Sequence, residues 1–201
     1  MRGRCIHAAA RALKRGLRGL LRRQDGSIAV ETVLMAPLLF WCLLGGHVYF
    51  EVFRVKTLNT KTAYMIGDYV SRESRELNDG FLDSTYALQG FLMGDERPRR
   101  LRVTSYEAAA NGYRVLWSQT RGAGIAPLTN AGLRRTEDAL PLMAEAERAI
   151  LVETWVEYEP AFGVGLGTQL FREFVVTRPR FNGGQICFNT SRDLRIETRQ
   201  C

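Results

Sequence analysis

The chain has 201 residues, a length that suits one globular domain with additional segments. It carries 28 basic and 21 acidic residues, a formal net charge of +7, which would ordinarily favour nucleic acid or anionic lipid as a partner. Eight of the basic residues and one acidic residue precede Ser27, so the rest of the chain carries 20 of each and is neutral. This distribution argues against strong nucleic-acid binding, which needs a cluster of phosphate-neutralising side chains.

Residues 1–26 form a basic segment in which several leucines lie among the arginines. A basic amphipathic helix can lie on an anionic membrane or bind nucleic acid. We interpret the segment as a cytoplasmic leader, because Lys and Arg that flank a first span hold that side in the cytoplasm and the other side goes outward. It differs from a secretory signal peptide, since the apolar stretch follows it and would be retained.

Residues 27–50 are the long apolar stretch of the chain, and Glu31 is their single carboxylate. A helix that rises about 1.5 Å per residue needs roughly 20 residues to cross a bilayer core. We therefore predict a transmembrane helix over this range, in which Pro37 either causes a kink or is tolerated. A carboxylate at full depth in a membrane costs on the order of 2–3 kcal/mol, which makes Glu31 a candidate functional residue.

Beyond the membrane, residues 51–98 are predicted to form a periplasmic helical stalk and a short second helix. We expect the long helix to continue through residue 77 and to stop at Asn78, Asp79 and Gly80. One apolar stripe follows a three-four spacing and would face a head domain. The stripe consists of Val55, Leu58, Thr62, Met65 and Tyr69. The second helix is expected over residues 81–93.

In residues 99–201 the apolar period changes to two, as in β-strands. Two alternating runs flank Asn111 and Gly112, and Asn-Gly in this position is the strongest short-range hairpin signal. The four predicted strands are residues 101–107, 113–119, 149–159 and 171–178, with a short helix near 129–139 between the second and the third. Strands with one apolar face suit an antiparallel sheet. We expect the outer half of the long helix to cover that face, which gives an α+β head.

Two of the four cysteines, Cys187 and Cys201, lie near the end of the outer domain. Disulfides form and persist beyond the inner membrane, and closing a loop of roughly fifteen residues contributes about 3 kcal/mol in the chain-entropy model. We therefore predict a disulfide between them. The alternative, metal ligation, needs more ligands than this segment offers.

The sequence lacks most of the residue patterns that catalysis needs, which favours a non-enzymatic protein without cofactor or metal. The histidines are His7 and His47, so the outer domain has none, which excludes a Ser-His-Asp site there. The glycines of residues 163–167 have the wrong spacing for a phosphate-binding loop, and we interpret them as a flexible connection. Trp117 and Trp155 could stack on a sugar or a base, but packing within the core or the sheet is commoner.

A basic leader, Gly26, and a glutamate at the fifth position counted from Ser27 together resemble the precursor signal of type IV pilins. This segment, a short head with few strands, and the late Arg178-Pro179-Arg180 resemble the TadE-like pseudopilins. These are minor pilin-like subunits of the tight-adherence (Flp) pilus system, a branch of type IV pili. Residues 22–55 carry most of the resemblance.

The resemblance implies that a prepilin peptidase cuts between Gly26 and Ser27, and that Glu31 then pairs with the new amino terminus of a neighbouring subunit. It implies a single-pass protein of the bacterial inner membrane with a cytoplasmic N-terminus and a periplasmic head. It also implies a role in pilus initiation, assembly or adhesion. The expected partners are the peptidase, other pilin-like subunits and the pilus assembly machinery.

Two alternatives remain open from the sequence. One is a signal-anchored periplasmic domain that is never cleaved and has a binding or enzymatic role. The other is a minor pilin whose head binds a surface ligand or DNA, and local basic residues keep it under consideration. These residues are Arg97, Arg99, Arg100 and Arg102.

Overall fold

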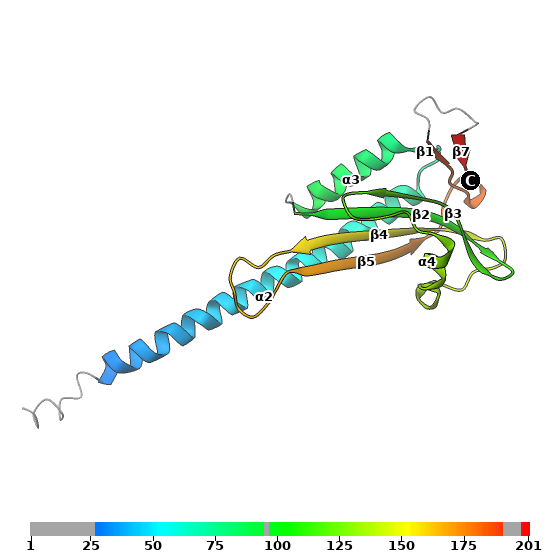
Figure 1. The fold of residues 1–201 in the computed structure, drawn as a ribbon. Helices are drawn as coiled ribbons and strands as arrows, with labels where there is room; N and C mark the ends of the chain where they lie inside the picture. Colours follow the sequence, from blue (N-terminus) through cyan, green and yellow to red (C-terminus); the bar gives the residue numbers. More distant parts are fainter. Residues whose placement is uncertain (1–26, 95–96, 191–197) are drawn as a thin grey trace, which may run out of the picture. The chain divides into compact units, whose positions relative to one another are not determined.

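The computed structural model describes residues 27–94, 97–190 and 198–201 (Figure 1). The predicted leader, residues 1–26, therefore lies outside the described residues. The chain divides into two compact units between Val48 and Tyr49. The predicted stalk at 51–98 and the predicted head at 99–201 both belong to the second unit, which we call the head.

Helix α2 runs from Ser27 to Ser71 and continues through Pro37. It ends earlier than the predicted residue 77, because a hydrogen bond from a distant part of the chain replaces the one that would continue the helix. The carbonyl oxygen of Ser71 accepts a hydrogen bond from the backbone N–H of Arg180 at 2.9 Å. Leu77, expected to be helical, instead lies in a short strand and is fully buried.

The head-forming part of α2 buries a stripe that consists of Val55, Asn59, Thr62, Ala63, Ile66 and Val70. The predicted head-facing stripe is confirmed at Val55 and Thr62. It is wrong at Met65 and Tyr69, whose side chains are about half exposed. The observed stripe differs from the predicted one because it includes the polar residue Asn59. Asn59 is buried, and its Oδ1 accepts a hydrogen bond from Thr154 Oγ1 at 2.9 Å. Hydrophobic periodicity does not detect a polar residue that is buried with its partner.

The sheet confirms the four predicted strands and their antiparallel pairing. The strands are β2 (Arg99–Ala109), β3 (Gly112–Arg121), β4 (Arg148–Tyr158) and β5 (Gln169–Thr177), and their order in space is β3-β2-β4-β5. The β2–β3 hairpin turns at the predicted Asn-Gly pair, where Gly112 has a φ of 108°. A bulge between Ser105 and Tyr106 shifts the register of this pair.

The two faces of the sheet have different covers. On one face, α2 and α3 pack over a core that includes Ile66, Val70, Leu82, Leu101, Val103, Trp117, Ile150 and Val152. Leu151 points the other way, because successive residues of a strand alternate between faces. There it forms a second cluster with Tyr106 and Leu133, beneath residues 122–147. The helix expected at 129–139 is two short pieces, α4 (Asn130–Arg134) and the 3-10 turn η2 (Glu137–Ala139).

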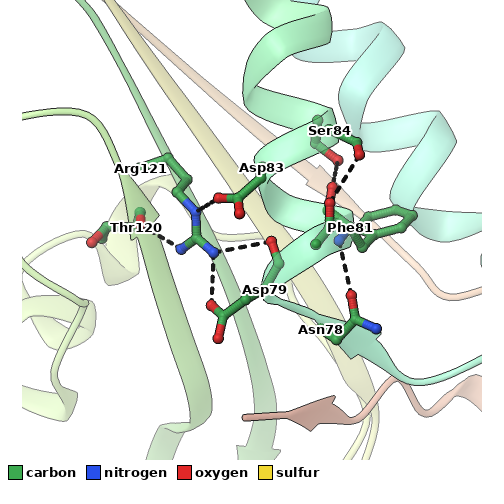
Figure 2. A network of polar contacts seen from close by, with 9 residues as sticks. Asn78, Asp79, Phe81, Asp83, Ser84, Thr120 and Arg121 are labelled. Carbon is green, nitrogen blue, oxygen red and sulfur yellow. Dashed lines mark hydrogen bonds and ion pairs between the residues drawn. The ribbon is translucent and has the colours of Figure 1, made fainter. Parts of the chain in front are cut away.

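Helix α3 (Asp79–Met93) is the predicted second helix, and its start is tied to the sheet (Figure 2). Asn78, expected to help stop α2, is instead the N-cap of α3, since its Oδ1 accepts the backbone N–H of Phe81 at 2.9 Å. Arg121 at the end of β3 contacts Asp79 Oδ1 at 2.7 Å and Asp83 Oδ1 at 2.5 Å. Burial lowers the pKa of Arg121, but hydrogen bonds with Asp83 and Asp79 outweigh burial and raise it above the usual value.

The C-terminal segment closes the head with a small second sheet. Strand β1 (Leu77–Asn78) pairs in parallel with β6 (Phe188–Asn189), which pairs antiparallel with β7 (Arg199–Gln200). The turn η3 (Asn182–Gly184) precedes this sheet. The predicted pairing of Cys187 and Cys201 is confirmed: the two sulfur atoms lie at disulfide distance and the Cα atoms are 4.4 Å apart.

Candidate functional site

The first unit contains most of the apolar part of α2, and of its large apolar side chains within the described residues only Val48, at its end, is buried. Large apolar side chains are well exposed from Ile28 to Leu43. Of the helices in the described ranges, α2 alone is long and apolar enough to cross a membrane, as judged by length and composition. A contiguous apolar surface of this extent marks contact with lipid or with another protein.

Glu31 lies in the second turn of α2 and is exposed in the single chain. It lines a shallow groove along one side of the helix, whose other walls are mainly apolar and include Ile28, Met35, Leu38 and Leu39. The nearby Thr32 hydroxyl donates a hydrogen bond to the carbonyl oxygen of Ile28 at 2.7 Å, within the same helix. The carboxylate is therefore the ionisable group that this surface presents to a cation or an amine.

The predicted cleavage point lies at the edge of the described residues. Ser27 is the first residue of α2, whereas Gly26 lies outside the described residues. Glu31 is four positions after Ser27, which corresponds to a rise of about 6 Å along a helix. An amine at Ser27 of one helix and a carboxylate at Glu31 of another would meet only if the two helices were displaced by about this distance.

A buried charge network on the sheet was not found by sequence reasoning. Glu153 in β4 has no exposed surface and lies 2.5 Å from Arg102 Nε and 2.6 Å from Arg172 Nη2. The guanidinium groups of both arginines also lie over the ring of Trp155. A charged residue in an alternating strand is ordinarily solvent-facing, so the sequence held no signal for this burial.

The four basic residues considered for DNA binding do not form one patch. Arg99 and Arg102 point to opposite faces of the sheet, because they are three residues apart on one strand. Arg99 lies over the ring of Tyr86 and Arg97 over that of Tyr158. Arg102 is held by Glu153. Direct contacts within the head therefore occupy three of the four side chains.

The two tryptophans discussed as stacking platforms are packed inside the head. Trp117 is almost fully buried, and its Nε1 donates to the carbonyl oxygen of Ile186 at 2.9 Å. Trp155 is partly buried beneath the two arginines of the Glu153 network. Neither ring offers an open face of the kind that sugar or base stacking requires.

A hollow of about 370 Å³ lies between the start of β4 and residues 178–185. Its ionisable residues are already paired, Arg178 with Glu147 at 2.9 Å and Arg148 with Glu107 at 3.3 Å.

Burial raises the pKa of Tyr106 well above its usual value, with further raising by Tyr113 and Glu147 and an opposing effect of Arg178. Within the described residues the Tyr106 hydroxyl has no hydrogen-bond partner.

In residues 27–94, 97–190 and 198–201, no three side chains of His, Cys, Asp or Glu gather closely enough to hold a metal ion. Comparison of the whole chain with protein-family models, curated proteins and solved structures finds no match.

Proposed function

We propose that the chain is a non-enzymatic pilin-like subunit of the TadE-like type, which takes part in initiating or assembling a tight-adherence pilus. Before assembly it resides in the bacterial inner membrane as a single-pass protein, with its basic leader in the cytoplasm and its head in the periplasm. The observation that carries the proposal is Glu31, the lone carboxylate on an otherwise apolar helical surface that begins at Ser27.

The mechanism is a pairing between subunits. A prepilin peptidase removes residues 1–26 and leaves a free amine on Ser27. When helices pack in an apolar environment, the Glu31 carboxylate of one subunit forms an ion pair with the protonated Ser27 amine of a neighbour. A buried ion pair adds little net stability, but an unpaired buried charge is strongly penalised. The pair therefore acts mainly by rejecting helix registers other than the displacement of about 6 Å given by four helical residues.

Features of the head support a location outside the cytoplasm. The pair Cys187–Cys201 lies at disulfide distance, and disulfides persist mainly in oxidising compartments. Outward placement of the head also follows from the concentration of positive charge before Ser27. The packing of α2 against the antiparallel sheet agrees with a pilin-like head, in which one helix belongs both to the apolar shaft and to the globular part.

The first test is the mass of the mature protein extracted from membranes. Cleavage predicts a chain that begins at Ser27, and Gly26→Ala should leave the precursor uncut. Recovery of the native chain with Met1 and the leader attached would instead support the uncleaved, signal-anchored alternative.

The second test separates pairing from cleavage. Glu31→Ala should be cleaved and membrane-bound but absent from sheared pili. The matched control is Glu51→Ala, which removes the first carboxylate after the apolar stretch. Glu51 forms a surface pair with Arg54 at 3.1 Å, and such pairs contribute little, so this variant should enter pili normally. Normal incorporation of Glu31→Ala would show that the pairing mechanism is wrong.

A further inference from the structure

The hollow between the start of β4 and residues 178–185 involves a sequence motif to which the proposed function gives no role, Arg178-Pro179-Arg180. Arg180 is held at the end of α2. Its backbone N–H donates to the carbonyl oxygen of Ser71 at 2.9 Å, and its Nη2 lies 3.0 Å from Asp68 Oδ1. Arg178 and Pro179 instead line the hollow. The motif therefore anchors one arginine and places the other at the hollow.

Part of the wall of this hollow has a strained backbone that hydrogen bonds hold in place. Ala146 lines the hollow with a φ of 62°, in the left-handed region that residues other than glycine rarely adopt. Its N–H donates to the carbonyl oxygen of Ala108 at 2.8 Å, and Glu147 Oε2 accepts the N–H of Ala144 at 2.9 Å. Strained positions of this kind cluster at ligand-binding sites, so this wall has the character of a built site.

Positive charge exceeds negative charge around the hollow. Arg178 contacts Glu147 at 2.9 Å, and these two charges balance each other. Arg148 Nε lies 3.3 Å from Glu107 Oε2, but the other oxygen of Glu107 is already paired with Arg114. Three arginines thus share two glutamates, which leaves an excess of one positive charge.

Arg148 also has a donor that nothing in the described part of the chain satisfies. Its Nη1 is buried and has no acceptor there, and a buried donor without an acceptor costs free energy. Arg148 lines the hollow, and its side chain is 26% exposed. Arg178 is 63% exposed, and a guanidinium has five N–H donors, more than its contact with Glu147 uses. Both arginines therefore have hydrogen-bonding capacity for a ligand in the hollow.

We propose that this hollow binds a carboxylate with a single negative charge, carried by a peptide end or by an acidic side chain. Arginine pairs well with carboxylates because its planar group can direct two parallel N–H donors at them. One negative charge balances the excess positive charge, whereas a dianion such as phosphate would leave a negative charge beside Glu147. The volume of about 370 Å³ lies at the lower end of the range of about 300–1,000 Å³ for ligand pockets. This inference depends neither on cleavage nor on membrane residence.

The test is ligand-observed saturation-transfer NMR on the full chain in neutral detergent micelles, with the Cys187–Cys201 pair intact. N-acetyl-glycylglycine supplies a terminal carboxylate, and the α-amide of N-acetylglutamate supplies a side-chain carboxylate. The neutral amide of N-acetyl-glycylglycine is the uncharged control. Acetate and inorganic phosphate are added as competitors at about pH 8, where phosphate is mainly a dianion.

Three variants locate the binding. Arg178→Gln removes the more exposed arginine of the hollow. Its matched control is Arg180→Gln, because Arg180 belongs to the same motif, is 58% exposed and contacts a carboxylate at 3.0 Å, but is not among the residues that line the hollow. Arg148→Gln is the second test variant, and it leaves Glu107 paired with Arg114.

We expect at least one of the two carboxylate ligands to bind and the neutral amide not to bind. Arg178→Gln and Arg148→Gln should each weaken binding about ten-fold or more, whereas Arg180→Gln should leave it unchanged. The tighter of the two ligands identifies a chain end or a side chain as the group that is bound. Absence of binding by both ligands, equal binding of acid and amide, or equal effects of Arg178→Gln and Arg180→Gln would overturn the site. Stronger competition by phosphate than by acetate would overturn the assignment of a single charge.

Discussion

The strongest stability prediction concerns Glu153, which is fully buried between two arginines. Glu153→Gln keeps the size of the side chain and removes its charge, so the effect is not confounded by a cavity. The variant leaves Arg102, only 13% exposed, facing a neutral amide. An uncompensated buried guanidinium is then the main consequence of the substitution.

The size of the effect follows from the exposure of the two arginines. Breaking a buried pair by removing one partner costs about 3–5 kcal/mol. Arg172 is 44% exposed and can be hydrated after the change, so its contribution is small. We therefore expect a loss of about 3 kcal/mol, a large part of the roughly 5–15 kcal/mol that stabilises a typical domain.

The assay is urea unfolding of the full chain in detergent micelles with the disulfide intact, followed by tryptophan fluorescence. With a slope of about 2 kcal/mol per molar urea, the expected loss lowers the midpoint by about 1.5 M. The control is Glu157→Gln, which changes a partly exposed carboxylate on the same strand and should stay within about 0.5 kcal/mol of the wild type. Equal midpoints for the two variants would refute the reasoning.

Two further predictions use the same unfolding assay. Replacing Cys187 and Cys201 by serine opens a loop with a sequence separation of 14 and should cost about 3 kcal/mol; an unchanged midpoint would show that the bond does not restrain the unfolded chain. Tyr106→Phe removes a hydroxyl without a partner in the described residues, so at pH 7 it should be neutral or stabilising by up to about 1 kcal/mol. Because the folded pKa of Tyr106 is raised, its contribution to stability is complete below its unfolded pKa of about 10 and is lost as pH rises above that value. The variant should lose less stability than the wild type between about pH 10 and 11, and an equal or greater loss would contradict the burial argument.

Much of the candidate site is visible in the sequence because its signals are local. The isolation of Glu31 in an apolar stretch depends only on neighbouring residues, and so does the charge before Ser27. The structure adds that the apolar side chains around Glu31 are exposed in the single chain. The role of Glu31 in pairing stays a prediction, because it depends on a second subunit.

The sequence by itself determined the apolar helix, the hairpin at Asn111 and Gly112 and the four strands, since periodicity and turn chemistry act over a few residues. Only the tertiary structure decided where α2 ends, because Leu77 leaves the helix to pair with Phe188, more than a hundred residues away in the chain. It also decided that Asn59 and Glu153 are buried. A polar side chain can leave water only when its partner arrives from another element, and that partner cannot be identified from local sequence.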